Sequence, residues 1–586
     1  MRIVLIYPPP WKISRPGEAP YPPGDGAPAG GDPARLLDGD FLQAPYGMLS
    51  IAAQARSAGH SVTTLNLANA CWAKVAQCLR NRQADLFGLS CVTANRRGAA
   101  MTARLIREIR PRAHIIVGGP HVTALPTETL AHWDAVDTVA LGEGERVFSD
   151  VIDDLAAGGP ATGIPGTAWR KAGAIAVSRR RPLIADLDTL TPPQAFFPVR
   201  TILTSRGCPG RCTFCGSGLM WGRRLRFHSV DYVMDVLERT VNHHRQPIVA
   251  IKDDTFTADR ERVMAICEAI HRRGLRFVWS CETRADCVDP EMLMAMRRAG
   301  CSRLSIGVES ASREILKRIR KDIDPDTVLA ATEMARNVGI QVRYYMMVGN
   351  RGETFETFSQ SIDFIRRARP HQYLFTQLHL YPGTPEYAVF RRHGAVSPET
   401  YFEKDFMHLT CYAGRPEDAP RILAALRPHE GVRDCWTAGV GDCARVLKSA
   451  GDLPAAHMDL CHACLRAGRI AEAEGHLKQA AAGGYCLSGL IHNARACIAA
   501  ARQDPDAVAR WLDSALACYP HQAVVDNVLR FSAWQDAGGA ASGKPIDLAP
   551  AAGFETVLVR EHPEFPEPDP VVDTGEVTPA VADLYF

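Results

Sequence analysis

Three cysteines lie close together near the middle of the chain, in the stretch Arg206-Gly-Cys-Pro-Gly-Arg-Cys-Thr-Phe-Cys-Gly216. Cys208, Cys212 and Cys215 have the spacing C-x3-C-x2-C, which allows three thiolates to hold three corners of a [4Fe–4S] cluster. The fourth iron then has no protein ligand and can bind a small molecule. A zinc site and three unrelated thiols are the alternatives, but zinc usually takes paired C-x2-C units, and no second pair lies nearby. The spacing therefore predicts an iron–sulfur cluster with one open iron.

Polar residues follow several short apolar runs in the region 200–400. These runs alternate with helical patterns, which predicts six βα units in a partial barrel whose active site lies at the carboxyl ends of its strands. The last of the six strands is expected over Phe375 to Tyr381. The polar residues at the strand ends are Asp253, Asp254, Arg284, Glu309 and Ser310. Acceptors such as Glu309 suit a ribose or an amine, and Arg284 suits a carboxylate as a fork. Each of these side chains has a plainer alternative, a salt bridge at the barrel rim.

The cysteine spacing is the signature of the radical S-adenosylmethionine (SAM) enzymes, which this region resembles. The resemblance implies that the open iron chelates SAM and that the reduced cluster cleaves it to a 5′-deoxyadenosyl radical. The segments Gly307-Val-Glu309-Ser, Asp253-Asp254 and Tyr381-Pro-Gly-Thr384 recur in the family at these places, so the five polar residues are expected to bind SAM. One departure is the turn Gly349-Asn-Arg-Gly-Glu-Thr354, where the family usually has a proline at the position of Arg351.

The first part of the chain alternates strand and helix patterns. Ile3 to Tyr7 is a continuous apolar run, as in the middle of a parallel sheet, and four more strands are expected before residue 157. Glycine turns follow the fourth and fifth strands at Gly118-Gly119 and Gly142-Glu-Gly144. Ligands of doubly wound parallel sheets bind beyond the carboxyl ends of the strands. The pattern predicts a Rossmann-like domain with a ligand at the glycine turns.

The order of these elements resembles the cobalamin-binding domain that precedes the barrel in one large group of radical SAM enzymes, the anaerobic-cyclase-like group. The resemblance implies that cobalamin contacts the strand ends, at Pro9, Ser90, Thr93, Ala94, Asn95, Gly118, Gly119, His121, Gly142, Glu143 and Gly144. The motif Asp-x-His-x-x-Gly, which brings a histidine to cobalt in other cobalamin proteins, is absent. The lower cobalt face is therefore expected to meet the loop from Ser90 to Asn95 without a histidine. A domain that kept the fold and lost the corrinoid is the alternative.

The pattern divides the chain into five parts. A cobalamin-binding domain covers 1–157, a connector 158–199, the partial barrel 200–400, a helical domain 401–544 and an acidic, proline-rich tail 545–586. The connector contains a possible hairpin around Trp169 and Ala174 to Val177. In the helical domain, Ala471 to Ala482 matches Asp506 to Ala517 at about the period of a tetratricopeptide helix pair. Cys461 and Cys464 lie inside an apolar helical pattern and are expected in the core.

Composition limits the partners. The net charge is +2, which gives no electrostatic case for nucleic acid, and no apolar run is long enough to span a bilayer. The 18 cysteines are scattered along a chain with no export signal, so reduced thiols and a cytoplasmic location are expected. A small-molecule substrate and an electron donor such as flavodoxin or ferredoxin follow from the resemblance. The C-terminal helices are a possible binding face for a protein partner.

The predicted function is cobalamin-dependent radical SAM methylation of an unactivated carbon in a small-molecule or natural-product substrate, by way of methylcobalamin and the deoxyadenosyl radical. Three alternatives stay open at this point. The chain is a cyclase or oxidative rearrangement enzyme, a polar methyl transferase that uses methylcobalamin without cleaving SAM at the cluster, or a non-enzymatic corrinoid-binding protein. The intact cysteine triad argues against the last of these. The substrate itself is not identified by the sequence.

Overall fold

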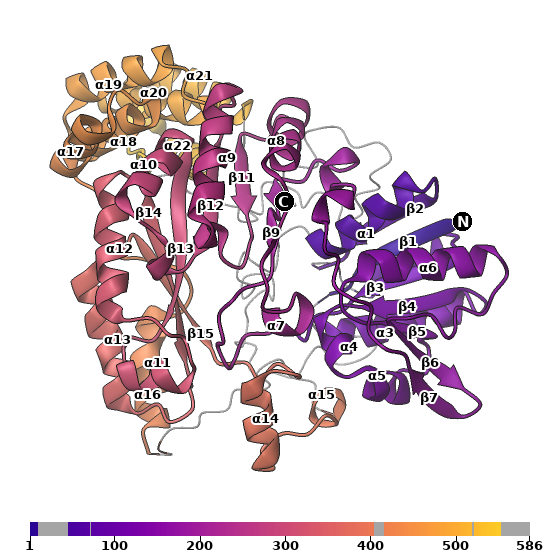
Figure 1. Cartoon of the computed structure of the whole chain (residues 1–586). Coiled ribbons are helices and arrows are strands. Elements are labelled where there is room, and N and C mark those ends of the chain that lie inside the picture. The colour runs from indigo at the N-terminus through magenta and orange to yellow at the C-terminus, as the bar shows by residue number, and fades with distance from the viewer. Residues whose placement is uncertain are drawn as a thin grey trace.

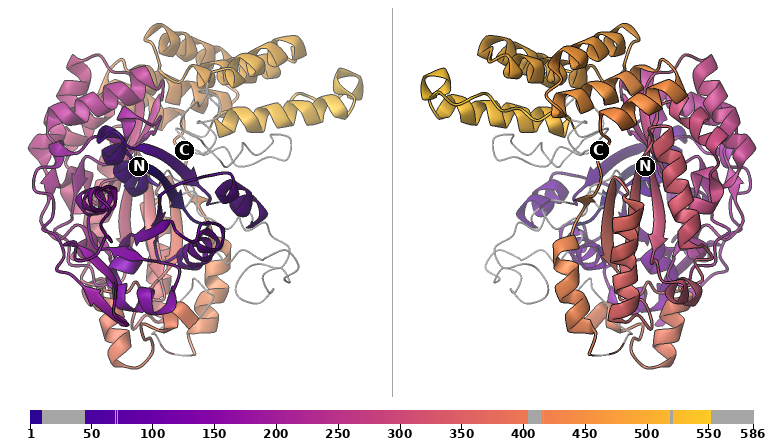
Figure 2. Two further views of the ribbon diagram at one scale, coloured as in Figure 1. Left: turned by 90° about the vertical axis from the view of Figure 1, so that its right-hand side faces the viewer. Right: turned by 90° about the vertical axis from the view of Figure 1, so that its left-hand side faces the viewer.

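The computed structural model describes residues 1–9, 45–68, 70, 72–403, 415, 417–518 and 521–551. The stretch from Arg15 to Pro45 is rich in Pro, Gly and Asp, which predicts a long irregular loop. Nearly all of it, and most of the expected C-terminal tail, lie outside the described residues. Two seven-stranded sheets stand side by side, and a layer of helices covers one end of the second sheet (Figure 1). Figure 2 shows the same helical layer projecting beyond the two sheet domains.

The first sheet is a doubly wound parallel sheet extended by an antiparallel hairpin. Its strand order is β2-β1-β3-β4-β5-β6-β7. The strands are β1 (Arg2–Tyr7), β2 (Ser61–Asn66), β3 (Leu86–Ser90), β4 (His114–Gly118), β5 (Thr138–Ala140), β6 (Thr167–Lys171) and β7 (Ala174–Val177). The helices are α1 (Tyr46–Ser57), α2 (Trp72–Arg80), α3 (Arg96–Ile109), α4 (Pro120–Ala124), α5 (Pro126–His132) and α6 (Gly144–Ala156).

Strand β1 shows why an unbroken apolar run is needed in this sheet. Ile3 and Leu5 pack on one face with residues of α1 and α6. Val4 and Ile6 pack on the other face with residues of α2 and α3. Because successive side chains of a strand point to opposite faces, both faces of a sheet covered by helices require apolar residues at every position. The prediction of a doubly wound sheet is confirmed.

The hairpin expected in the connector is part of the first sheet. β6 pairs antiparallel with β5, and β7 pairs antiparallel with β6. The strand hydrogen bonds of β5 are satisfied by this pairing, so the sheet continues beyond the parallel strands. The structural unit therefore extends past the boundary that the sequence placed at residue 157.

The second sheet has six parallel strands and one short antiparallel edge strand, in the order β16-β15-β14-β13-β12-β11-β8. Its strands are β8 (Thr201–Ile202), β11 (Ile248–Ile251), β12 (Val278–Thr283), β13 (Cys301–Glu309), β14 (Gln341–Val348), β15 (Gln372–Gln377) and β16 (Arg433–Asp434). The covering helices are α8 (Val230–Glu238), α9 (Arg260–Arg272), α10 (Pro290–Arg298), α11 (Arg313–Arg318), α12 (Pro325–Asn337) and α13 (Phe355–Ala368). β15 begins at Gln372, three residues before the start that the sequence predicts. The sheet is the partial barrel that the sequence predicts.

Short elements connect the two sheets. Strand β9 (Ser205–Arg206) pairs antiparallel with β10 (Arg226–Phe227), and the cysteine loop and α7 (Ser217–Met220) lie between them. After β15 the chain forms α14 (Pro385–Arg392) and α15 (Thr400–Glu403), which lie at the lower end of Figure 1. Tyr401 and Phe402 of α15 belong to the same apolar cluster as the core of the first domain.

The C-terminal region is helical, as predicted. Its helices are α16 (Ala419–Leu426), α17 (Val440–Ala450), α18 (Pro454–Arg466), α19 (Ile470–Ala482), α20 (Ser488–Ala501), α21 (Pro505–Leu516) and α22 (Gln522–Asp536). α19 and α21 occupy equivalent places in two successive helical pairs, and the aligned residues Leu477 and Leu512 are both buried. Cys461 and Cys464 lie in the core of this region.

The C-terminal helices close the amino end of the barrel. Ile248 and Val278, at the first positions of β11 and β12, belong to the same apolar cluster as α18 and α20. Arg297 of α10 donates to Asp459 of α18 at 2.5 Å, and the Arg297 side chain is 1% exposed. The expected protein-binding face is in part used by this internal contact. Among the described residues, no helix is both long and apolar enough to cross a membrane.

Candidate functional site

The cysteine loop follows the first barrel strand, and its glycines decide how tightly it folds. Gly207 has a φ of +95°, and a β-carbon there would lie 2.5 Å from the carbonyl oxygen of Arg224, so only glycine fits this turn. A β-carbon at Gly210 would lie 3.3 Å from the sulfur of Cys208 and 3.8 Å from the sulfur of Cys212. Two of the three sulfurs therefore gather around a residue that has no side chain.

The third sulfur lies in the same electrostatic environment. Burial raises the pKa of Cys215 to about 11, and Asp254, Cys212 and Cys208 contribute in the same direction. Burial also raises the pKa of Cys212, while Lys321 and Arg284 act to lower it. Metal binding displaces the thiol protons, and the positive charge of the metal then offsets the repulsion between the thiolates. Three thiols in one short loop, with two cations near Cys212, fit an iron–sulfur cluster.

Asp253 holds the start of the cysteine loop. Its side chain is fully buried, and its carboxylate accepts hydrogen bonds from Thr204 N at 2.6 Å, Ser205 N at 3.1 Å and both hydroxyls of Thr204 and Ser205. Burial raises the pKa of Asp253, and these hydrogen bonds oppose the rise. Both oxygens are used inside the protein, so the expected contact with SAM is not formed by Asp253 in this arrangement. Its carboxylate instead fixes the strand that leads into Cys208.

Asp254 lies closer to the mouth of the barrel. Its carboxylate accepts a hydrogen bond from the Ser217 hydroxyl. Burial raises the pKa of Asp254, and the neighbouring Asp253 and Glu282 contribute to the rise. Because it also influences Cys215, Asp254 stands beside the cluster ligands. Its role in binding SAM stays a prediction.

Arg284 is engaged within the protein. Its guanidinium forms a fork on Asp286, with distances of 2.9 Å and 2.8 Å, and donates to the carbonyl oxygens of Lys321 and Asp322. The Arg284 guanidinium therefore has no free edge with which to form the predicted fork on a SAM carboxylate. Arg284 instead holds the loop that carries Lys321, and it places a positive charge beside Cys212.

Glu309 forms a buried ion pair next to the cysteine loop. Its Oε1 lies 3.1 Å from Lys321 Nζ, and the side chains of Glu309 and Lys321 are 13% and 9% exposed. A β-carbon at Gly307 would lie 2.8 Å from each of these two atoms, so the glycine makes room for the pair. Glu309 has a φ of +67° at a register shift in β13, a strained position of the kind found at functional sites. The geometry places Glu309 at the mouth, as predicted.

Ser310 points away from the mouth. It is fully buried, accepts a hydrogen bond from Ser312 N at 3.2 Å, and lies 3.4 Å from the Ser361 hydroxyl of α13. Its predicted contact with SAM is not supported by this position. The structure thus brings Asp254 and Glu309 to the cysteine loop and uses Asp253, Arg284 and Ser310 to build the frame around it.

The polar inner face of the barrel includes a group of residues that the sequence analysis did not select. Lys252 Nζ lies 2.9 Å from Glu282 Oε1, and the Tyr345 hydroxyl lies 3.3 Å from the same oxygen. Ile251, Cys281 and Tyr344, next to them in sequence, point to the opposite, apolar face of the sheet. The signal was present as period-two alternation on β12 and β14. Lys252, Glu282 and Tyr345 are additional candidates for contacts with SAM or substrate.

The residues predicted to bind cobalamin lie at one edge of the first sheet. Ser90, Thr93, Ala94, Gly118, Gly119, Gly142 and Gly144 are half-buried, and all lie at or just past the ends of β3, β4 and β5. Gly119 has a φ of +116°, and a β-carbon there would lie 2.4 Å from the carbonyl oxygen of Cys91. Figure 1 shows these strands running from the N-terminal side toward the middle of the molecule, where the barrel stands. An edge of backbone and small side chains fits a flat corrinoid face.

Three of the predicted cobalamin residues have structural partners instead. Pro9 is buried, and its carbonyl oxygen lies 2.0 Å from where a β-carbon on Gly98 would be. Asn95 is fully buried at the end of the loop that begins at Ser90. Its side-chain amide accepts a hydrogen bond from Val92 N and donates one to the Ser90 carbonyl, and these bonds hold the loop closed. His121 is 1% exposed and packs against the rings of Tyr401 and Phe402. These contacts shape the edge rather than face it.

His121 is neutral in this environment. Burial, with a contribution from Arg96, lowers its pKa to about 3. Its Nδ1 lies 3.3 Å from the Thr93 hydroxyl, and its Nε2 has no hydrogen-bond partner among the described residues. The ring packs against Tyr401 and Phe402 of α15, and the absence of a histidine ligand on cobalt stays a prediction.

Glu143 joins the two domains. Its carboxylate lies 3.1 Å from Arg206 Nη1 and 2.8 Å from Arg226 Nη2, and it accepts from Ile184 N at 2.6 Å. Glu145 lies 2.5 Å from the other terminal nitrogen of Arg206. All four side chains are less than 10% exposed. The prediction that the Glu143 carboxylate contacts cobalamin is therefore replaced by a buried ion-pair cluster, which we call the Arg206 clamp.

The Arg206 clamp connects the two candidate cofactor sites. Arg206 is two residues before Cys208, and Glu143 lies between the two glycines at the end of β5. A buried, hydrogen-bonded ion pair has a defined geometry, because each charge depends on its partner for stabilisation. The clamp therefore sets the position of the cysteine loop relative to the edge of the first sheet.

Comparison with known families supports this division of the chain. A model described as the radical SAM superfamily matches residues 202–365. A model described as the B12 binding domain matches residues 40–152. The first match contains the cysteine loop and most of the barrel strands, and the second contains the edge of the first sheet.

Individual proteins match over the same regions. An uncharacterized methyltransferase, PH0819, of Pyrococcus horikoshii is 30% identical over 362 residues, which are 59% of this chain and 78% of that protein. The anaerobic magnesium-protoporphyrin IX monomethyl ester cyclase of Rubrivivax gelatinosus is 25% identical over 304 residues, which are 49% of this chain and 55% of the cyclase. The structure of the radical SAM methyltransferase TsrM from Kitasatospora setae, with cobalamin and a [4Fe–4S] cluster bound, has a TM-score of 0.53. That match covers 67% of this chain and 75% of the TsrM chain at 18% identity, which shows a shared fold.

Proposed function

We propose that this chain, which belongs to the cobalamin-dependent radical SAM enzymes, methylates an unactivated carbon of a small-molecule substrate. The cofactors of the family are a [4Fe–4S] cluster, SAM and cobalamin. Its relatives include methyltransferases and cyclases, and the Pyrococcus horikoshii relative is described as an uncharacterized methyltransferase. The choice of carbon methylation within this family is the proposal.

The observation that carries the proposal is the Arg206 clamp. It joins the loop of the three cysteines to the glycine edge of the first sheet through four buried side chains. Methylation of an unreactive carbon needs a radical source and a methyl donor held near one substrate, because holding reactants together lowers the entropic part of the barrier. A fixed connection between the two sites meets this requirement.

Each cofactor has residues in the chain that fit it. Cys208, Cys212 and Cys215 would hold the cluster, and the half-buried strand ends of the first sheet would hold cobalamin. Asp254 and Glu309, with Glu282 beside them, offer oxygen acceptors for the amine and ribose of SAM. When bound, the cluster with SAM supplies a carbon radical, and cobalamin supplies the methyl group.

The remaining side chains position and shield. Asp253 fixes the strand before the loop, and Arg284 fixes the loop after α11. The helices α18 and α20 pack on the amino ends of β11 and β12 through an apolar cluster. The Lys252–Glu282–Tyr345 group presents fixed charges and a hydroxyl to the inner face, where they orient a polar substrate.

Product analysis tests the proposal. The holoenzyme, reconstituted under anaerobic conditions with a chemical reductant, is incubated with SAM, cobalamin and candidate substrates from its gene neighbourhood. We expect one S-adenosylhomocysteine and one 5′-deoxyadenosine for each methylated product, because one SAM donates methyl and another is the source of the radical. The Cys208→Ala protein, which keeps the cobalamin edge intact, is the matched control and should form neither the methylated product nor deoxyadenosine.

Two results would refute the proposal. Methylated product without deoxyadenosine would show polar methyl transfer. Deoxyadenosine together with an unmethylated, cyclised or oxidised product would place the chain with the cyclases.

A further inference from the structure

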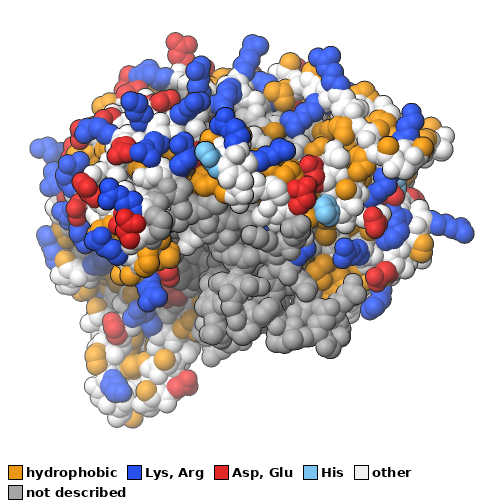
Figure 3. Space-filling view, turned by 90° about the horizontal axis from the view of Figure 1, so that it is seen from below, with side chains coloured by type: hydrophobic (Ala, Val, Ile, Leu, Met, Phe, Trp, Pro, Cys, Tyr) orange, Lys and Arg blue, Asp and Glu red, His pale blue; other side chains and the backbone are white. Residues whose placement is uncertain are grey.

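A strongly basic pocket lies next to the cysteine loop, and Thr213 of that loop is among its lining residues. It has a volume of about 820 Å³, within the range of small-molecule sites, and five arginines line it. They are Arg318, Arg320, Arg351, Arg391 and Arg392. No aspartate or glutamate is among the described residues that line the pocket. The face seen from below also carries many Lys and Arg side chains (Figure 3).

The arginines come from three separate segments that the fold brings together. Arg318 ends α11 and Arg320 follows it, Arg351 lies in the turn after β14, and Arg391 belongs to α14. Arg351 Nε donates to Glu386 at 2.8 Å, and Arg318 pairs with Glu314 at 2.5 Å. Arg320, Arg391 and Arg392 form no ion pair within the described part of the chain. Like charges converging on one hollow repel each other unless an anion lies between them.

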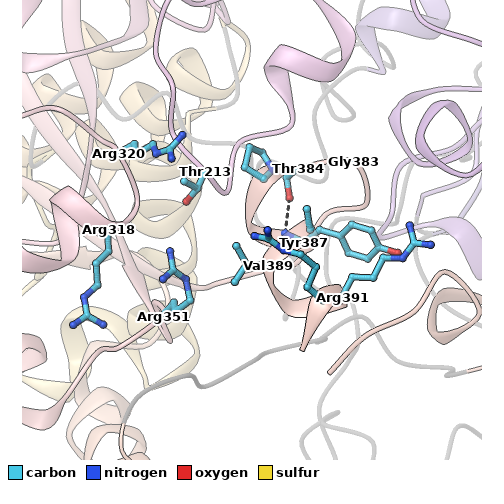
Figure 4. Close-up of a pocket in the computed structure, with 12 residues that line it drawn as sticks. Thr213, Arg318, Arg320, Arg351, Gly383, Thr384, Tyr387, Val389 and Arg391 are labelled. Carbon is cyan, nitrogen blue, oxygen red and sulfur yellow. Dashed lines mark hydrogen bonds between the residues drawn. The ribbon is translucent and has the colours of Figure 1, made fainter. Parts of the chain in front are cut away.

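Thr213 gives the pocket a polar floor. Its side chain is buried, its residue is 5% exposed, and its hydroxyl has no hydrogen-bond partner among the described residues. Figure 4 shows this hydroxyl directed into the space between Arg320, Arg351 and Val389. A buried hydroxyl without a partner costs free energy, and a ligand oxygen at this point would remove that cost.

The floor is part of the cysteine loop. Thr213 stands between Cys212 and Phe214, and its backbone donates to the Ile319 carbonyl and accepts from Glu386 N, each at 2.9 Å. Arg320 has a φ of +52°, and this turn sends Arg320 to the pocket while the next residue, Lys321, reaches Glu309 beside Cys212. The pocket and the cluster site therefore share one wall.

We propose that this pocket binds the phosphate groups of a small molecule. Guanidinium groups are suited to phosphate oxygens, because each presents a planar fork of donors to an oxyanion. Five of them line this pocket, three without an ion pair among the described residues, and with the hydroxyl at the floor they match a diphosphate better than a single carboxylate. This inference does not rest on the proposed function, because its test measures binding without turnover.

An acidic protein surface is the competing occupant, and the pocket distinguishes the two. Exposed arginines serve either ligand. The Thr213 hydroxyl lies at the bottom of a concave site, where a small anion can approach it and the surface of a folded protein cannot. Dependence of binding on this hydroxyl therefore identifies the small molecule.

Isothermal titration calorimetry of the reconstituted holoprotein with inorganic pyrophosphate, at about 0.15 M salt, tests the proposal. We expect saturable binding at one site. The double substitution Arg320→Ala/Arg391→Ala should weaken it at least tenfold, since two guanidinium groups that form charge-assisted hydrogen bonds with the phosphate oxygens are lost. Thr213→Val, which keeps the shape and removes the hydroxyl, should weaken binding at least threefold while the iron content stays unchanged.

The matched control removes two arginines elsewhere. Arg272 and Arg298 are exposed at the ends of α9 and α10, so Arg272→Ala/Arg298→Ala changes the net charge equally and should leave binding unchanged. Equal weakening in both double variants would show unspecific attraction and overturn the proposal. Absence of saturable binding would do the same. Weakening by the arginine substitutions without any effect of Thr213→Val would assign the surface to an acidic protein instead.

Discussion

Substitution of Arg206 by methionine should separate the two domains without removing either cofactor site. Arg206 contacts Glu143 at 3.1 Å and Glu145 at 2.5 Å, and the three side chains are 4–5% exposed. Without Arg206, Glu145 keeps a hydrogen bond from Ser50, and Glu143 keeps Arg226. Removing one partner of a buried ion pair usually costs about 3–5 kcal/mol, because a buried charge is left uncompensated. We expect Arg206→Met to lower the unfolding free energy by an amount in this range.

The pH dependence of this loss has a defined sign. Burial acts to raise the pKa of Glu145, but Arg206 outweighs burial and holds that pKa below its usual value. In the wild-type protein this contribution is present above the unfolded pKa and is lost as the pH falls. In Arg206→Met the charge and the hydrogen bond of Arg206 are lost, so burial is opposed only by the Ser50 and backbone hydrogen bonds; the pKa of Glu145 therefore rises, and the carboxylate can take a proton at low pH. The difference between the two proteins should therefore be larger at pH 8 than at pH 5.

A double-mutant cycle with Glu145→Gln isolates the pair. Urea unfolding of the apoproteins, followed by circular dichroism, should show that the double variant loses at least about 1 kcal/mol less than the two single losses together. Arg313→Met is the control, because Arg313 pairs with Asp324 on the surface, where the side chains are 66% and 45% exposed. An exposed pair contributes about 0–1 kcal/mol.

Function supplies a second measurement for the same variant. Iron content and cobalamin content of Arg206→Met should stay near those of the wild type, while formation of methylated product falls. A loss of stability below about 1 kcal/mol, or additive losses in the cycle, would refute the clamp as a connection between the domains.

Three further predictions concern single groups. Alanine at Cys208, Cys212 or Cys215 should abolish the cluster, as measured by iron analysis and electron paramagnetic resonance. Cys287 interacts electrostatically with Cys208, and the control variant Cys287→Ala should keep the cluster. Loss of the cluster in Cys287→Ala alone would contradict the assignment. Because the His121 ring is buried against Tyr401 and Phe402, the cob(II)alamin spectrum should lack axial nitrogen splitting in both the wild type and His121→Ala. Splitting that vanishes in the variant would make this prediction wrong. Burial raises the pKa of Glu353 from 4.5 to about 7, so its contribution to stability is present at low pH and is lost as the pH rises through 7. Relative to Glu353→Gln, the wild type should lose up to about 3 kcal/mol of unfolding free energy between pH 5 and 8. Parallel pH profiles of the two proteins would argue against a raised pKa of Glu353.

Local spacing was enough to predict the two sheets and to select three cysteines of one loop as candidate cluster ligands. Cys208, Cys212 and Cys215 lie in one short loop, so their spacing alone keeps the three thiols near one another. The apolar run of β1 and the period-two alternation of the barrel strands report burial directly, because strand geometry assigns each side chain to one face. Strand ends could therefore be placed to within a few residues, and the candidate site residues of each sheet were located at its carboxyl edge.

The partners of the polar side chains were decided by the tertiary structure alone. Glu143 and Arg206 are 63 residues apart in the chain, and no local pattern indicates that they form an ion pair. Arg284 points at Asp286 and at a loop 37 residues away, although its position at a strand end suggested a ligand. The basic pocket likewise joins Thr213 to arginines far along the chain. Burial by distant segments fixes which oxygen and nitrogen atoms meet, and this is why the sequence located the site while the fold assigned the role of each residue.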